Sequence, residues 1–178
     1  MRIIGGINRG RKLKAPDGLS TRPTLDKVRS AVFNVLFDVT GKSVLDMFGG
    51  SGAMTLEALS RGASSGVIID NDRKAFAVIK ENVKSLGAEA QTDLRNGDFR
   101  KCVRFGEQFD LIFLDPPYFE HLMEDALDLI DRNQLLTDNG IVVCETDASC
   151  VPDYTAFGFE CIKSKRYGQT QVLFLKIN

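Results

Sequence analysis

From residue 43 onwards, the apolar positions switch repeatedly between the spacing of a strand and the spacing of a helix. Short apolar runs predict strands at residues 43–47, 66–69, 88–94, 109–114 and 140–145. Helical spacing predicts helices between them at residues 53–60, 73–86 and 121–132. Strands that alternate with helices are typical of an α/β protein with a doubly wound, mostly parallel sheet. In such a sheet, ligands bind beyond the carboxyl ends of the strands.

The two ends of the chain depart from this alternation. Residues 157–163 and 171–177 are strand candidates, and the stretch between them is too short for a helix. They predict an antiparallel C-terminal hairpin, and hence a seven-stranded sheet with one reversed strand. Residues 2–15 alternate polar and apolar groups around glycines, which predicts a short N-terminal hairpin. A helical period follows at residues 24–37.

The composition fits a globular protein of one domain with a short addition. The chain has 178 residues, of which 43% are hydrophobic and 26% are charged. We expect residues 1–40 to form a hairpin and helix that pack on an α/β domain at residues 41–178. We find no apolar run of membrane-spanning length and no signal peptide pattern. The four cysteines are widely spaced and there is one histidine, so we expect reduced thiols, no metal and a cytoplasmic location.

Charge is distributed unevenly, although the net charge is only −1. Residues 1–29 contain eight Lys or Arg residues and two Asp residues, so the rest of the chain is acidic. A basic arm on an acidic body can bind a phosphate backbone, or it can be a solvated leader without a partner. Charge alone supports both interpretations about equally. The candidate contacts to nucleic acid are Arg2, Arg9, Arg11, Lys12 and Lys14.

A glycine-rich turn, DMFGGSG at residues 46–52, joins the first predicted strand to a helix. Glycines let the backbone approach a ligand closely, and the helix start presents free amides. The NAD fingerprint would require glycine at position 55, where the chain has Thr55. Methyltransferases of this sheet class use an acid-x-G-x-G-x-G pattern, which fits except that phenylalanine replaces the first glycine. A tight turn with no ligand is the alternative. The candidate cofactor residues here are Asp46, Phe48, Gly50 and Gly52.

Further acidic residues follow the next two predicted strands. Asp70 comes about 20 residues after the turn, where an acid can accept hydrogen bonds from ribose hydroxyls. Asp98 could accept a bond from an adenine amine, and Phe99 could lie against the purine face. The alternatives are that both acids cap helices and that Phe99 is a core aromatic.

The sequence Asp115-Pro116-Pro117-Tyr118 follows the fourth predicted strand. Consecutive prolines fix φ and remove two backbone donors, which leaves acceptors on a stiff turn. The Asp115 carboxylate and the Pro116 carbonyl could hold both hydrogens of an exocyclic base amine and direct its lone pair at a methyl donor. Tyr118 could stack on an exposed base. The alternative is a strand-ending turn with an incidental tyrosine.

Together with Arg22-Pro23-Thr24 and the leader MRIIGGINRGRKLKAPDG, these motifs resemble the bacterial 16S rRNA guanine-N2 methyltransferase family over essentially the whole chain. The resemblance implies a Rossmann-like methyltransferase fold and the cofactor S-adenosylmethionine. It implies methylation of guanine-966 by a monomer that acts on a 30S subunit or an assembly intermediate. In the family pattern, Arg22 and Thr24 close the methionine end of the cofactor, while the basic arm holds rRNA.

The chain departs from the family pattern at two positions of the cofactor site. Gly49 replaces an alanine, from which we expect a looser turn, and Asp70 replaces a longer glutamate. Three other functions are compatible with parts of the sequence. An adenine-N6 or cytosine-N4 nucleic-acid methyltransferase shares the chemistry, a non-catalytic RNA-binding assembly factor would keep only the fold, and a nucleotide-dependent oxidoreductase is disfavoured by Thr55.

Overall fold

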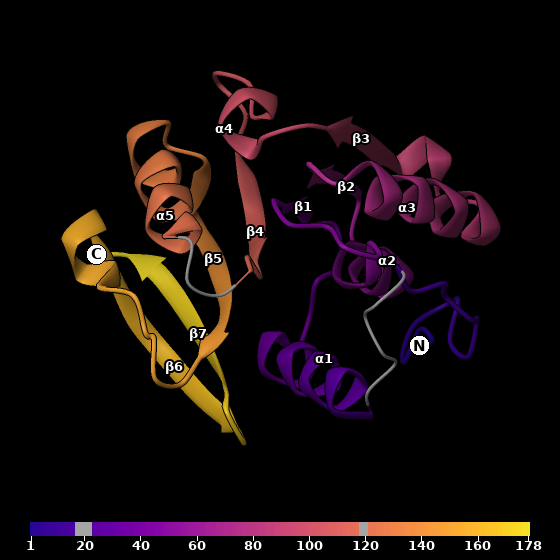
Figure 1. Ribbon diagram of the computed structural model, residues 1–178, viewed down its shortest axis with the longest axis horizontal. Coiled ribbons are helices and arrows are strands. Elements are labelled where there is room, and N and C mark those ends of the chain that lie inside the picture. Colours follow the sequence, from indigo (N-terminus) through magenta and orange to yellow (C-terminus); the bar gives the residue numbers. More distant parts are fainter. Residues whose placement is uncertain (17–22, 118–120) are drawn as a thin grey trace.

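The computed structural model describes residues 1–16, 23–117 and 121–178 (Figure 1). The helices are α1 (Pro23–Leu36), α2 (Ala53–Ser60), α3 (Arg73–Leu86), α4 (Phe99–Cys102) and α5 (Leu122–Arg132). The strands are β1 (Ser43–Asp46), β2 (Ser65–Asp70), β3 (Thr92–Asn96), β4 (Phe109–Leu114), β5 (Leu136–Asp147), β6 (Phe159–Tyr167) and β7 (Thr170–Ile177). Two short 3-10 helices, η1 (Glu89–Gln91) and η2 (Tyr154–Phe157), precede β3 and β6.

The strands form one seven-stranded sheet in the order β3-β2-β1-β4-β5-β7-β6. The first five are parallel, and β7 is antiparallel to both of its neighbours. This arrangement confirms the predicted doubly wound sheet with one reversed strand. The chain progresses outward in one direction from β1 to β3 and in the other from β4, so the switch point lies between β1 and β4. The ends of these two strands are therefore the expected place for a ligand.

Helices cover both faces of the sheet because alternate residues of each strand point to opposite sides. Val44 of β1 belongs to a core that also contains residues of α1, α2 and α3. Its neighbour Leu45 belongs to a second core with residues of α4 and α5. Figure 1 shows α1, α2 and α3 on one side of the strands and α5 on the other.

The N-terminal segment packs against α2. A single antiparallel bridge joins Arg2 and Lys12, so the predicted hairpin is present as a short hydrogen-bonded loop without an extended ladder. The backbone N–H groups of Ile4 and Gly5 donate to the Glu57 carboxylate at 2.7 and 2.8 Å. These bonds attach the segment to the helix that follows the glycine-rich turn.

Glu57 is fully buried, and two arginines balance its charge. Arg61 donates from Nε to Glu57 at 2.7 Å, and Arg29 of α1 lies with its Nε 3.6 Å from the other carboxylate oxygen. Arg29 is itself 4% exposed and donates to the Arg2 carbonyl at 2.6 Å and to Asp26 at 2.9 Å. Buried charges are tolerated when they are paired in this way. The cluster joins the N-terminal segment, α1 and α2.

Three predicted boundaries were wrong. The third strand occupies Thr92–Asn96 and not 88–94, because residues 89–91 form a 3-10 turn. The fifth strand extends over Leu136–Asp147. Strand β6 continues to Tyr167, so the turn between the last two strands, expected at residues 164–170, shrinks to two residues.

Within the described ranges, no helix has both the length and the apolar character that crossing a lipid bilayer requires.

Candidate active site

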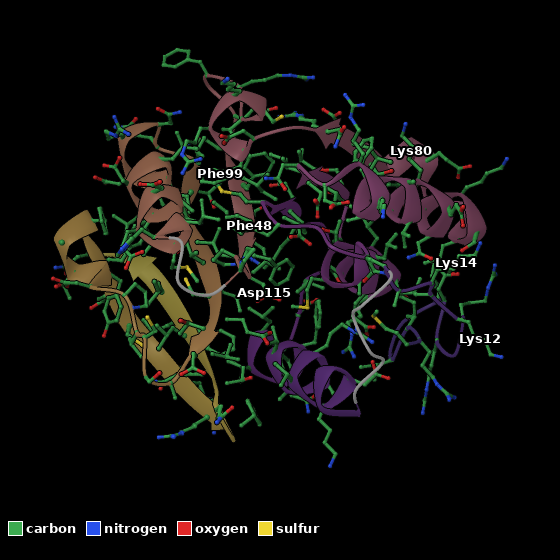
Figure 2. The ribbon with its side chains drawn as sticks, viewed as in Figure 1. Lys12, Lys14, Phe48, Lys80, Phe99 and Asp115 are labelled. Atoms are coloured by element: carbon green, nitrogen blue, oxygen red, sulfur yellow. The ribbon has the colours of Figure 1, made fainter. Side chains whose placement is uncertain are left out.

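The carboxyl ends of β1, β4 and β5 open onto a cavity of about 160 Å³ on the face of the sheet that α1 covers. The glycine-rich turn forms one wall, and Arg29 and Val32 of α1 form another. Figure 2 shows Phe48 and Asp115 near each other at the middle of the molecule, where these strands end. The lining residues with polar side chains or a sequence-based assignment are Arg29, Asp46, Phe48, Gly50, Ser51, Asp115 and Glu145.

Asp46 is a buried carboxyl with weak hydrogen bonds. It is 3% exposed, and its oxygens accept from the Phe48 N–H at 3.4 Å and from the Thr55 hydroxyl at 3.5 Å. Both distances exceed the usual range for such bonds. Burial outweighs the bond from Phe48 and, with the charges of Asp115 and Asp70 adding to it, raises the pKa of Asp46 to about 7. A cationic ligand group would satisfy this carboxylate and lower its pKa again.

Asp115 and Glu145 are neighbours across two parallel strands. Leu114 of β4 pairs with Cys144 of β5, so Asp115 and Glu145 occupy the next position on each chain. Both line the cavity. Desolvation raises the pKa of both carboxyls, and the charge of Asp115 raises that of Glu145 further. The rise is larger for Glu145, because the charge of Asp115 adds to its desolvation.

Glu145 was not predicted from the sequence, although it ends the predicted strand at 140–145 and so satisfies the rule that strand ends carry ligands. In the part of the chain that the structure describes, no group of three or more His, Cys, Asp or Glu side chains is arranged to hold a metal ion.

Asp70 supports the glycine-rich turn from β2. Its carboxylate accepts from the Gly50 N–H at 2.7 Å and from the Asp72 N–H at 2.8 Å. Gly50 and Gly52 adopt φ values of 57° and 76°, a region that favours glycine. A carboxylate has about four acceptor positions, so Asp70 can still accept from a ligand hydroxyl. The turn is therefore shaped before any ligand arrives.

Gly49 packs tightly, contrary to the looser turn expected at this position. A Cβ atom here would lie 2.5 Å from Cγ2 of Ile68 and 2.9 Å from Cδ1 of Ile79. The Gly49 N–H also donates to the Ile69 carbonyl at 2.8 Å. A methyl group at this position would force these two isoleucines to shift, because they fill the space that it would occupy.

The residues assigned to the adenine end lie beside the cavity and do not line it. Phe99 is 4% exposed, and its ring centroid is 5.1 Å from that of Phe48 (Figure 2). The Arg100 guanidinium lies 4.7 Å from the Phe99 centroid and pairs with Asp98 at 3.0 Å. Asp98 also caps α4 by accepting from the Arg100 N–H at 2.9 Å. Arg100 was not predicted from the sequence. It contacts both residues assigned to the adenine, Asp98 and Phe99.

Three of the predicted site residues cannot be placed with their side chains. Arg22 and Tyr118 lie outside the described residues. Thr24 falls in the first turn of α1, but its side chain is not described. Pro116 is buried directly beside Asp115.

The basic arm lies along α3. Arg2, Arg9 and Lys12 are exposed, whereas Arg11 donates to the Ser85 carbonyl and Lys14 forms an ion pair with Glu81. Figure 2 shows Lys12, Lys14 and Lys80 on the same side of the molecule, away from Asp115.

Asn82 connects this arm to the glycine-rich turn. The buried side chain donates to the carbonyls of Lys14 and Ser51, both at 2.9 Å, and accepts from the Lys14 N–H at 2.8 Å. No sequence pattern predicted that Asn82 would connect the arm to the turn. The arm and the wall of the cavity are thus held by one side chain.

The sheet order, the glycine-rich turn after β1 and the Asp-Pro-Pro turn after β4 together define the Rossmann-like methyltransferase fold. A solved structure of the candidate methyltransferase yhhF from Escherichia coli covers 100% of this chain and 98% of its own length with a TM-score of 0.89 and 34% identity. A candidate methylase from Haemophilus influenzae covers 100% and 99% with a TM-score of 0.81 and 30% identity.

The chain belongs to the family described as conserved hypothetical protein 95, whose pattern matches residues 1–176. Ribosomal RNA small subunit methyltransferase D of Escherichia coli is 36% identical over 83% of this chain and 75% of its own length. The candidate rRNA methyltransferase YlbH of Bacillus subtilis is 38% identical over 99% of this chain and 98% of its own length.

Proposed function

We propose that the chain transfers a methyl group from S-adenosylmethionine to the exocyclic N2 amine of a guanine in 16S rRNA, guanine-966 by the family resemblance. The observation that carries the proposal is the position of Asp115. It lies beside the buried Pro116 at the switch point of the sheet, and it lines the same cavity as the glycine-rich turn. The names of relatives as rRNA methyltransferases support rRNA as the substrate.

The described residues fit a cofactor that carries positive charge. When bound, S-adenosylmethionine supplies an electrophilic methyl group on a sulfonium. Asp46, with its long hydrogen bonds, would hold the ammonium group, and Asp70 would accept from the ribose hydroxyls. Asp98 and Phe99 would contact the adenine once Arg100 leaves the face of the Phe99 ring. Gly50 and Gly52 would allow close backbone approach, and Arg22 and Thr24 would close the methionine end.

Asp115 and Pro116 would act on the amine. The Asp115 carboxylate accepts one amine hydrogen and the Pro116 carbonyl accepts the other, which localises the nitrogen lone pair and aligns it with the methyl group. Tyr118 would hold the base. The proton that leaves the nitrogen after transfer passes to an Asp115 oxygen, and the raised pKa of this carboxyl favours that step. The rate gain comes mainly from orientation and electrostatics.

RNA would bind along the arm. We propose that Arg2, Arg9 and Lys12 contact phosphates directly, and that Arg11 and Lys14 do so after exchanging their contacts on α3. The proposed substrate is 16S rRNA within a 30S subunit or an assembly intermediate, and the proposed state is a monomer in the cytoplasm. We propose that residues 1–40 serve as the RNA-binding addition and residues 41–178 as the methyltransferase domain.

The test is to incubate the protein with labelled S-adenosylmethionine and, separately, 16S rRNA, immature or assembled 30S particles, or DNA. Digestion to nucleosides identifies the product. We expect label in N2-methylguanosine from one of the ribosomal substrates. Label in N6-methyladenosine, in N4-methylcytidine or in DNA would replace this proposal by the alternative methyltransferase function. RNA binding without any transfer would support an assembly factor.

Asp115→Ala tests the assigned chemistry. We expect kcat to fall by at least about 10²-fold, as for removal of a group that stabilises a transition state, while calorimetry still detects cofactor binding. Asp138→Ala is the matched control, because Asp138 is exposed on β5 at the end far from the cavity. Loss of cofactor binding in the Asp115 variant would contradict the division of roles.

A further inference from the structure

We propose that Glu145 selects guanine by accepting a hydrogen bond from the ring N1–H, while Asp115 holds the adjacent N2 amine. This inference rests on the function proposed above and assigns a specificity-determining residue within the same site. No sequence motif marks Glu145, and the assignment is based on its position in the fold beside Asp115.

The pleat of the sheet places both carboxyls on one face. Phe113 of β4 and Val143 of β5 are paired, and both belong to the core on the α1 side. Side chains two positions further along point to the same side, so Asp115 and Glu145 face the cavity beneath α1. Neighbouring strands are about 4.8 Å apart, which is a separation that one base edge can bridge.

Glu145 lacks a partner among the described residues. No described side chain or backbone group donates a hydrogen bond to its carboxyl, although the residue is half-buried in the sheet. Arg29, a cationic residue that lines the same cavity, directs its hydrogen bonds to the Arg2 carbonyl and to Asp26. Its oxygens are not sealed from solvent, so water or a ligand can supply the donor that a half-buried carboxyl needs. The cavity is therefore set up to receive a donor at this point.

Guanine is the base whose edge provides that donor. Its N1–H lies next to the N2 amine, so two adjacent acceptors fit two adjacent donors. Adenine and cytosine also have an exocyclic amine, but the ring nitrogen beside it carries a lone pair and no hydrogen. Above its raised pKa, the Glu145 carboxylate facing that lone pair would be repelled and left unpaired. Sites that hydrogen-bond a substrate group reject analogues that lack it far better than apolar sites do.

The test compares two bases that both have the 2-amino group. The target position is first mapped with the wild-type protein, and the substrate is then rebuilt with either guanine or 2-aminopurine there. In 2-aminopurine, N1 carries a lone pair and no hydrogen. The measured quantity is the ratio of kcat/KM for guanine to kcat/KM for 2-aminopurine, in the wild type and in Glu145→Gln, at a pH above the raised pKa of Glu145 of about 8, where this carboxyl is ionised. The amide of glutamine can accept from N1–H or donate to the lone pair, so it should serve both bases.

We expect the wild-type protein to favour guanine and Glu145→Gln to lower the ratio by about 10- to 100-fold, the effect of one hydrogen bond to a charged group. Asp138→Asn, an exposed carboxyl on the same strand, should leave the ratio unchanged. Equal losses for both bases would assign Glu145 a structural role and overturn the inference, as would an unchanged ratio. Failure of the wild type to methylate guanine N2 in the mapping step would instead refute the proposed function, and the inference with it.

Discussion

The buried Glu57 cluster gives the sharpest stability prediction. Replacing Glu57 by alanine removes the acceptor for two backbone N–H groups, at 2.7 and 2.8 Å, and for Arg61 at 2.7 Å. It also leaves Arg29, 4% exposed, with Asp26 as its remaining described carboxylate. Breaking a buried ion pair by removing one partner costs about 3–5 kcal/mol. That is a large part of the roughly 5–15 kcal/mol that stabilises a typical domain.

Urea unfolding measures this loss as a lower midpoint at an unchanged slope. Glu57→Gln should lose less, because its carbonyl still accepts from one backbone N–H. Hydrogen exchange should accelerate at the amides of both Ile4 and Gly5 in Glu57→Ala and at one of the two in Glu57→Gln, since each amide bonds to a different oxygen of Glu57.

Glu89→Ala is the control, because Glu89 is exposed in the short 3-10 helix η1. Its free energy of unfolding should stay within about 0.5 kcal/mol of the wild-type value. A loss below about 1 kcal/mol for Glu57→Ala, with unchanged exchange at the two amides, would refute the role of Glu57 as the anchor of the N-terminal segment.

Two further predictions concern the walls of the cavity. Because the folded protein holds a proton on Asp46 up to about pH 7 and the unfolded chain only up to about pH 4, Asp46 lowers stability progressively as pH rises between these values. Asp46→Asn should therefore stabilise the protein by up to about 4 kcal/mol at pH 8 and by little at pH 4, while weakening cofactor binding; equal thermal midpoints of variant and wild type at pH 8 would contradict this reasoning. Gly49→Ala should destabilise the protein by about 1–3 kcal/mol through overpacking against Ile68 and Ile79. Ile79→Val removes one of the clashing methyl groups and should recover part of the loss in denaturant titrations, whereas strictly additive effects would argue against the clash.

Much of the fold could be predicted because strong periodicity marks its central elements. The predicted bounds of α2, α3 and β4 agree with the structure. The prediction failed for β3, whose sequence TDLRN has no apolar alternation. Arg95 is buried there through ion pairs with Asp93 at 2.7 Å and with Glu107, a long-range arrangement that local pattern does not reveal.

The candidate site was predictable where it follows strand ends, and it was missed where tertiary contacts create it. Asp46, Asp70 and Asp115 could be found because Asp46 lies in the last two residues of a predicted strand and the other two directly follow one. Glu57 lies within a helix that reads as an ordinary half-polar segment, and only the approach of the N-terminal segment turns it into an anchor. Arg100 likewise looks like a solvated charge until its guanidinium is placed on Phe99.

The position of β7 has a consequence for synthesis on the ribosome. Because β7 lies between β5 and β6, the outer edge of β5 has no strand partner until residues 170–177 have emerged, long after β5 itself. Val172 of β7 pairs with Glu145 and completes the wall of the cavity. A nascent chain that has reached β6 therefore still carries an open strand edge, the kind of surface that chaperones shield. The wall of its cavity is incomplete until β7 is inserted, so a partly made chain has no finished site.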